Sequence, residues 1–316
     1  MESMSGGGAQ PVWESFYGRT VEHLTGSRRN PHIVFAAVAF DGGYRTLDGG
    51  RSWEKVLEGD VRTFTIDPND EGVVYAGSGP IGLYRSEDYG GSWEPLDGLL
   101  ALPDEVKSQW TVPERLRGLE HPHVRHIFVH PDDVNFIFLV LEHGGVVLSR
   151  DGGRSWRDRS SGITYLDMHV LRDFPKNNNR YYVSSARGFY RTDNCGHQWE
   201  RVENGMPWAY TEFYSYSHEW MLLPGTPCRM ILCAAKGSPF FWPRERRDPQ
   251  GIILLSDDGA KNWWEATVEE NLNPMPWMPW VLVPHPADEK MVFAGMGDGS
   301  RASDSTRKRE EVAAST

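Results

Sequence analysis

The sequence predicts an all-β protein built as a six-bladed β-propeller of four-stranded blades. Three observations lead to this prediction. A short motif recurs five times, strand-like apolar runs precede each copy, and the 316 residues include 33 Gly, 21 Pro and 13 Trp. Abundant glycine and proline indicate frequent turns between short strands rather than long helices.

The recurring motif has the pattern Ser/Thr-x-Asp-x-Gly-x-x-Trp. Its acidic position is occupied by Asp48, Asp88, Asp151, Asn194 and Asp258, and it ends at Trp53, Trp93, Trp156, Trp199 and Trp263. Asp and Ser/Thr side chains can hydrogen-bond turn backbone, glycine accepts a positive φ, and tryptophan buries a large ring between sheets. We therefore expect the five acidic-position side chains to be structural rather than catalytic.

This pattern resembles the Asp-box, or BNR, repeat of sialidases, sortilin-type receptors, xyloglucanases and photosystem II assembly factors. The resemblance covers nearly the whole chain. It implies a propeller in which each box turn lies between the third and fourth strands of a blade. It implies little about function, because proteins with this repeat have very different activities.

Six innermost strands are predicted to start near Val21, Val61, Val124, His169, His218 and Trp280. The sixth blade is incomplete at its C-terminal side. Residues 12–16 resemble an outermost strand, so we expect the N-terminus to close the ring. Residues 11–298 should then form a single propeller, with residues 1–10 and 299–316 disordered.

Insertions interrupt the repeat at residues 96–122, 202–216, 236–250 and 266–279. Connections between blades, and between the second and third strands of a blade, emerge on the face opposite the box turns. Loops on a rigid scaffold are common places for binding sites. Trp208 and Trp242 fall in these insertions, and Trp220 and Trp280 fall in innermost strands. We expect these four side chains either to pack loops or to wall an aromatic pocket for substrate.

Alignment of the blades on their boxes places four histidines at one position near the start of the innermost strand: His23, His126, His169 and His218. Such side chains would converge on the channel axis, and imidazole is a common ligand of Fe, Cu and Zn. We predict a divalent transition metal there, with Fe or Cu favoured and Zn as an alternative. Four nearby carboxylates are candidates to accept from the second ring nitrogens: Glu22, Glu219, Asp167 and Glu120. Two other roles of the four histidines remain open. They can hydrogen-bond to water and backbone, or they can act directly as acid–base catalysts.

Arg62 and Arg125 occupy the neighbouring column and would suit an anionic substrate. Together these features favour a metal-dependent, oxidative enzyme acting on a small acidic or aromatic molecule. The first alternative is a non-catalytic interaction or assembly propeller. The second is a sialidase-like glycoside hydrolase, although the sialidase Arg-Ile-Pro motif is missing and no facing pair of carboxylates is evident. His143, before two glycines, is expected to face solvent.

Composition restricts the partners. The net charge of −11 argues against nucleic acid, because phosphate binding needs a basic surface. The longest apolar run, residues 136–141, is too short to span a bilayer. The three cysteines have no CxxC spacing, and the N-terminus has no apolar signal segment. We expect a cytoplasmic protein with a small-molecule substrate, and the sequence does not determine its oligomeric state.

Overall fold

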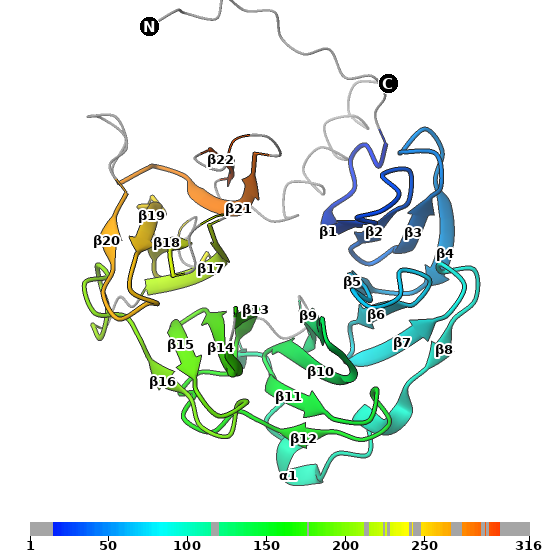
Figure 1. Ribbon diagram of the computed structural model, residues 1–316, viewed down its shortest axis with the longest axis horizontal. Helices are drawn as coiled ribbons and strands as arrows, with labels where there is room; N and C mark the ends of the chain where they lie inside the picture. Colours follow the sequence, from blue (N-terminus) through cyan, green and yellow to red (C-terminus); the bar gives the residue numbers. More distant parts are fainter. Residues whose placement is uncertain are drawn as a thin grey trace, which may run out of the picture.

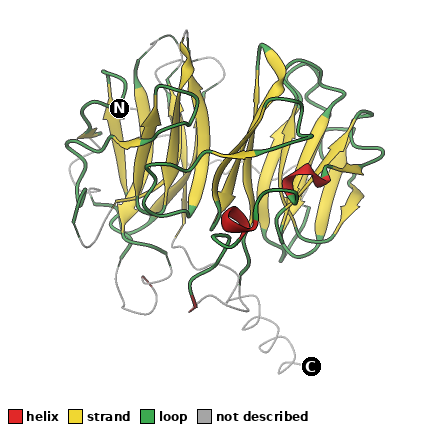
Figure 2. Cartoon of the chain, turned by 90° about the horizontal axis from the view of Figure 1, so that it is seen from below, coloured by secondary structure: helices red, strands yellow, loops and turns green. Residues whose placement is uncertain are grey.

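The computed structural model describes residues 15–114, 120–175, 177–211, 215–223, 225, 228–239, 242, 248–266, 274–285, 288 and 291–297. The regular secondary structure of this part of the chain consists almost entirely of strands joined by loops, which confirms the all-β prediction (Figure 2). The named helical segments are the 3₁₀ turn η1 (Asp97–Leu99) and the short helix α1 (Asp104–Lys107). No helix among these residues has the length and apolar character that a membrane crossing requires.

The strands form six antiparallel sheets in chain order, five of four strands and one of two. Sheet 1 contains β1 (Val21–Gly26), β2 (Val34–Val38), β3 (Gly42–Thr46) and β4 (Glu54–Glu58). Sheet 2 contains β5 (Val61–Ile66), β6 (Val74–Ser78), β7 (Gly82–Ser86) and β8 (Glu94–Pro95). Sheet 3 contains β9 (His123–His130), β10 (Asp133–Glu142), β11 (Gly145–Ser149) and β12 (Arg157–Asp158).

Sheet 4 contains β13 (Met168–Phe174), β14 (Asn177–Ser185), β15 (Gly188–Thr192) and β16 (Glu200–Arg201). Sheet 5 contains β17 (Ser215–Leu222), β18 (Met230–Lys236), β19 (Ile252–Ser256) and β20 (Trp264–Glu265). Sheet 6 contains β21 (Met278–Pro284) and β22 (Val292–Gly297). The sheets follow one another around a central axis, with the first strand of each sheet innermost and the fourth strand of sheets 1–5 outermost (Figure 1).

Each hydrophobic core lies between two consecutive sheets rather than inside one of them. Tyr75 and Leu83 of sheet 2, for example, share a buried cluster with Ile127 and the box residue Trp156 of sheet 3. Similar clusters join sheets 1 and 2, 3 and 4, 4 and 5, and 5 and 6. Burial of apolar surface between sheets therefore fixes the radial arrangement.

The box turns close through short-range hydrogen bonds. In the third box, Ser149 Oγ accepts from the Gly153 amide at 2.8 Å and donates to Asp151 Oδ1, also at 2.8 Å. Asp151 also accepts from the amide and hydroxyl of Ser155, and these bonds lower the pKa of its carboxyl group to about 2. Asp48, Asp88, Asn194 and Asp258 occupy equivalent positions in their turns. These side chains serve the turn backbone.

The predicted closing strand lies mostly outside the described residues, as do the segments 1–10 and 299–316 that were predicted to be disordered. The first described side chains of this region belong to residues 15–20. Phe16 packs edge-on against Tyr44 and Trp53, with 5.0 Å between ring centroids in both pairs.

Candidate functional site

The candidate site is the end of the central axis at which the innermost strands begin, near His23, Arg125, His169 and His218, and we call it the channel end. Every innermost strand has a register irregularity near this end, between Val21 and His23 in β1 and at corresponding places in the other five. A bulge leaves local backbone groups without ladder partners. The histidine column coincides with this irregularity.

Three of the four column histidines contact the backbone of the next innermost strand through Nδ1. His23 accepts from the Phe64 amide at 3.4 Å. His169 Nδ1 lies 2.6 Å from the Ser217 carbonyl, and His218 Nδ1 lies 3.1 Å from the Trp280 carbonyl. Arg125 Nη2 is 3.1 Å from His218 Nε2, so this nitrogen accepts and Nδ1 donates. The column thus joins consecutive sheets by hydrogen bonds.

His23 and His126 are held neutral. Burial, reinforced by Arg125 and Arg172, lowers the pKa of His23 to about 4. Burial and Arg172 place the pKa of His126 well below its ordinary value. Within the described residues, the donor atoms of Glu120, Glu142 and His143 lie within 4.8 Å of one another, as three ligands of one metal ion would. The four column histidines, which the structure also describes, form no such group. The structure therefore does not gather the column around one ion, and the identity of any metal stays a prediction.

The two arginines predicted to bind an anion are paired with carboxylates of the same chain. Arg62 Nε is 2.8 Å from Asp60 Oδ1, and its guanidinium group lies over the Phe40 ring. Glu22 bridges both arginines, at 3.7 Å from Arg62 and 3.3 Å from Arg125. Glu22 and Glu219 were expected to orient histidines. They pair instead with arginines, Glu219 with Arg172 at 2.6 Å. The small anionic substrate stays a prediction.

A second set of charges lies beside Arg125. Glu142, at the end of β10, has its Oε2 3.2 Å from His123 Nε2 and 3.5 Å from Arg125 Nε. His123 is fully buried, and its Nδ1 is 3.0 Å from the His121 carbonyl. His121 in turn pairs with Asp60 at 2.8 Å. Contacts of arginine and histidine side chains with carboxylates therefore link sheets 1, 2 and 3 around this end of the channel.

His143 is the main difference from the sequence-based view of this region. It was expected to face solvent, but its side chain is 4% exposed. Its Nε2 lies 3.7 Å from Glu120 Oε2, and its Nδ1 lies 3.9 Å from Asp167 Oδ2. Burial alone would lower the pKa of His143, but Glu120, Asp167 and Glu142 outweigh it and raise the pKa to about 9. His143 is therefore a buried cation at neutral pH.

The tryptophans predicted to form an aromatic wall mostly pack the interior. Trp220 is fully buried and donates through Nε1 to the Val170 carbonyl, so it cannot offer a surface to a ligand. Trp242 is also buried, where it donates to the Lys236 carbonyl. Trp208 packs against the core between sheets 4 and 5, and the partly buried Trp280 packs against His218 at 4.9 Å.

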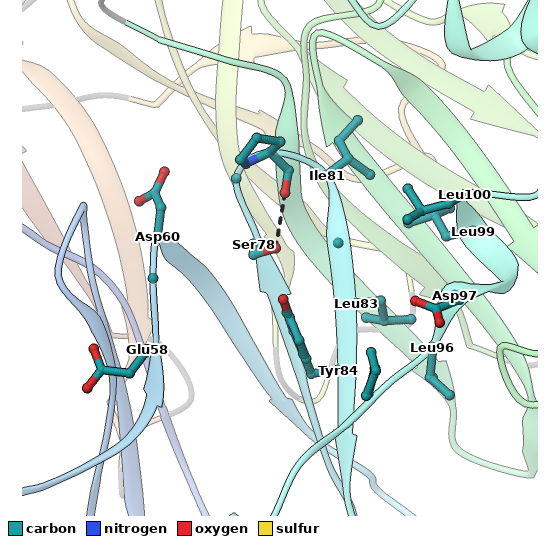
Figure 3. A pocket seen from close by; sticks show the side chains of 15 residues that line it. Glu58, Asp60, Ser78, Ile81, Leu83, Tyr84, Leu96, Asp97, Leu99 and Leu100 are labelled. Carbon is teal, nitrogen blue, oxygen red and sulfur yellow. Dashed lines mark hydrogen bonds between the residues drawn. The ribbon is translucent and has the colours of Figure 1, made fainter.

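A surface pocket of about 260 Å³ lies beside this end of the channel (Figure 3). The hairpin between β6 and β7, the end of β8 and the start of the first insertion line it, with Ser78, Tyr84 and Leu99 among the lining residues. Asp60 lines the same pocket and so connects it to the ion pairs around Arg62. None of the predicted site residues lines this pocket, although Arg62 contacts its lining residue Asp60. The repeat alignment therefore did not find the pocket.

Sequence reasoning missed the group formed by Glu120, Glu142 and His143 as a unit. Glu120 and Asp167 were noticed only as possible partners of the histidine column. A signal was present, since Glu142 and His143 stand at the end of a long apolar strand, directly before two glycines. The turn that follows needs left-handed backbone, with φ of +63° at His143 and +82° at Gly145. Both side chains lie beside Glu120 at this turn.

No family model matches the chain, and no curated protein matches it in sequence. Solved structures do match. The GH74 xyloglucanase from Xanthomonas campestris has a TM-score of 0.68 at 16% identity, covering 88% of this chain and 44% of that one. The GH74 enzyme of Niastella koreensis has a TM-score of 0.60 at 16% identity, covering 82% and 38%. The WD40 β-propeller domain of Doa1 has a TM-score of 0.55 at 11% identity, covering 89% and 79%.

This chain thus spans less than half the length of the two GH74 enzymes, and identities this low establish shared fold only. The matching structures are glycoside hydrolases and a WD40 domain, not metal-dependent oxidative enzymes. His169 and His218 of the histidine column also contact backbone carbonyls of the next sheet. The prediction of a metal-dependent oxidative enzyme is therefore wrong. The radial sheets and the structural neighbours together show a β-propeller fold, and its turns between third and fourth strands have the bonding pattern expected from the Asp-box sequence.

Proposed function

We propose that this propeller is a non-catalytic interaction scaffold that binds a partner protein on its insertion-bearing face. The observation that carries the proposal is the pairing of the charged groups at the channel end. Arg62, Arg125 and His143 are each neutralised by carboxylates of the same chain. Groups held in such pairs make a rigid platform rather than a reactive centre.

Large apolar side chains on the same face support this proposal. Phe40 is 63% exposed, Tyr210 63% and Trp277 50%. Phe40 lies in the β2–β3 hairpin, and the other two lie in connections between sheets. Tyrosine, tryptophan and phenylalanine are enriched at the centres of protein interfaces, where they supply large contact area. The predicted cytoplasmic location is compatible with such a role and stays a prediction.

Site-specific photo-crosslinking tests this proposal. A photoreactive amino acid at position 40, 210 or 277 should give a discrete crosslinked product with one partner protein in the native host. Leu47 and Tyr89, which are 55% and 45% exposed in box turns of the opposite face, are matched control positions. Equal crosslinking from both faces would contradict a specific binding face.

The same proposal includes a closed ring of six blades, completed by the N-terminal strand. Phe16 supports it, because this side chain covers Trp53. The corresponding box residues of later sheets are covered by the preceding sheet, as Trp156 is by Leu83. Leu24, Val281 and Val283 are exposed apolar residues on the innermost strands of sheets 1 and 6, and ring closure would cover them. Deletion of residues 1–14 should then lower the melting temperature, and an unchanged value would argue against closure.

A glycoside hydrolase is the second candidate, and one observation favours it. Carboxylate oxygens of Glu120 and Glu142 lie within 4.8 Å of each other, beside His143. Retaining glycosidases hold two carboxyl groups roughly 5–5.5 Å apart, one as nucleophile and one as acid. Two GH74 enzymes share the fold, which makes this chemistry compatible with the scaffold.

Hydrolysis of a panel of β-glucans and sialosides tests this candidate. If it holds, Glu120→Gln and Glu142→Gln should each lower kcat roughly 10²- to 10⁴-fold. Glu58→Gln is the matched control, because that side chain is 84% exposed. A panel without turnover, or turnover unaffected by both variants, would leave the interaction scaffold as the better account.

A further inference from the structure

Three metal-ligating side chains converge at the channel end, apart from the histidine column. One oxygen each of Glu120 and Glu142 and one ring nitrogen of His143 lie within 4.8 Å of one another. The His143 Nε2 to Glu120 Oε2 distance is 3.7 Å, too long for a hydrogen bond. Two donors on one tetrahedral ion, each about 2.0–2.1 Å from it, lie about 3.4 Å apart. The spacing of these donors is therefore closer to that of shared ligands than to that of a direct bond.

An independent observation concerns the imidazole of His143. The side chain is 4% exposed, and within the described part of the chain its Nε2 has no hydrogen-bond partner. A buried polar atom without a hydrogen bond costs free energy, and a bound ion is one of the ways in which native proteins satisfy such an atom. This nitrogen faces Glu120, which lies in the first insertion.

The other nitrogen of the same ring has a carboxylate partner. Asp167 Oδ2 lies 3.9 Å from His143 Nδ1, and Asp167 Oδ1 lies 3.6 Å from His169 Nε2. Metal-bound histidines commonly donate their second N–H to a carboxylate, which fixes the tautomer and leaves the first nitrogen free to ligate. Asp167 Oδ2 faces Nδ1 of His143 from beyond direct hydrogen-bond distance, and we assign it this role as a positioning residue when the ion is bound.

The surrounding charges also favour a cation. Glu120, Glu142 and Asp167 surround the ring, while His123 and Arg125 contact Glu142 from the side of sheet 3. Three carboxylates around one imidazole favour a divalent cation, and ligation by His143 requires the ligating ring nitrogen to be deprotonated.

We propose that Glu120, Glu142 and His143 bind a divalent cation of the Zn²⁺ or Mn²⁺ type, which ties the first insertion to sheet 3. One imidazole and two carboxylates suit these borderline and hard ions and not Cu(I), which prefers sulfur. The site shares no residue with the four-histidine set, requires no redox chemistry and does not depend on the proposed partner binding.

Calorimetric titration of the tag-free, EDTA-treated chain with ZnCl₂, and separately with MnCl₂, tests the proposal. We expect one ion per chain, with proton release detected by repeating the titration in buffers of different ionisation enthalpy. Glu120→Gln and His143→Gln should each weaken binding at least tenfold, and Asp167→Asn by roughly tenfold. Co²⁺ should give the intense visible absorption of a tetrahedral site, and both ligand variants should lose it.

His32→Gln is the control variant, because His32 is an exposed imidazole of sheet 1 and should leave binding unchanged. Circular dichroism establishes that each variant is folded, and Glu120→Gln carries the test if His143→Gln does not fold. Absence of saturable binding up to about 1 mM of either ion would overturn the proposal. Equal affinity in wild type, Glu120→Gln and Asp167→Asn would do the same, because it would place the ion elsewhere on the surface.

Discussion

The two ends of the propeller are stabilised in opposite ways. At the box end, each turn is closed by bonds between residues two to four positions apart, as from Ser149 to Asp151 and from Gly153 to Ser149. At the channel end, the decisive contacts join distant segments, such as Arg125 with Glu22, which are 103 positions apart. The first kind of contact repeats five times with the same geometry. The second kind uses different residue pairs at each place where it occurs.

This difference indicates where the individuality of the protein lies. A local turn can be repeated because it needs only its own residues. A buried ion pair between sheets needs both sheets in place, and loss of one partner leaves a charge without compensation. We therefore expect substitutions at the channel end to have the larger effects and to act on several sheets together.

The largest effect is expected from Arg125→Met, which leaves Glu22 and Glu142 without their shared cation. A loss of about 3–5 kcal/mol in the free energy of unfolding should follow. Urea denaturation measures it, and the control is Arg229→Met, because the Arg229–Asp257 pair lies on the surface. Equal losses in the two variants would contradict the contrast between buried and exposed pairs.

Gly162→Ala tests the contacts between sheets without changing any charge. The added Cβ would lie 2.1 Å from the Trp199 carbonyl oxygen, at a backbone φ of +90°. We expect a loss of about 3–4 kcal/mol, part from the clash and part from the left-handed backbone. Gly59→Ala separates the two parts, since its φ is +93° and nothing lies within 4 Å. This control should lose only about 1–2 kcal/mol, and equal losses would mean that the Trp199 contact adds nothing.

The pH dependence of stability should differ between wild type and His143→Gln, both measured in EDTA. The pKa of His143 is raised to about 9 in the folded protein. Its ion pairs therefore contribute fully below pH 6.5, weaken as pH rises and are lost above pH 9. The pH-dependent part of the difference is at most about 3 kcal/mol. Unfolding at pH 6 and at pH 10 measures it, and a constant difference across this range would show that His143 is not a buried cation.

The smallest effect is expected from a single box turn. Ser149→Ala removes a fully buried hydroxyl and leaves the Gly153 amide without its acceptor, which should cost about 1–2 kcal/mol. Thermal unfolding of Ser149→Ala and Ser86→Ala should show similar losses, because the two turns have matching bonds. A much larger loss at one of them would mean that boxes are not independent local units.

The histidine column shows how far sequence reasoning reached. The alignment correctly brought His169 and His218 into contact, with 4.9 Å between their ring centroids. It could not reveal that a bulge in each innermost strand presents backbone groups to these rings. Hydrogen bonds to the next strand engage Nδ1 of three of the four rings and so turn the column toward contacts between sheets. His143 was missed for a related reason, since its burial depends on an insertion that folds over it.

The sequence by itself determined the repeated parts of this protein. The box pattern, the strand-like apolar runs and the positions of the six innermost strands follow from residues close together in the chain. Local sequence is therefore sufficient to predict these elements. Only the tertiary structure decided which charges meet at the channel end. Glu120, Glu142 and His143 come together because the first insertion returns over sheet 3, and no spacing within one repeat encodes that approach.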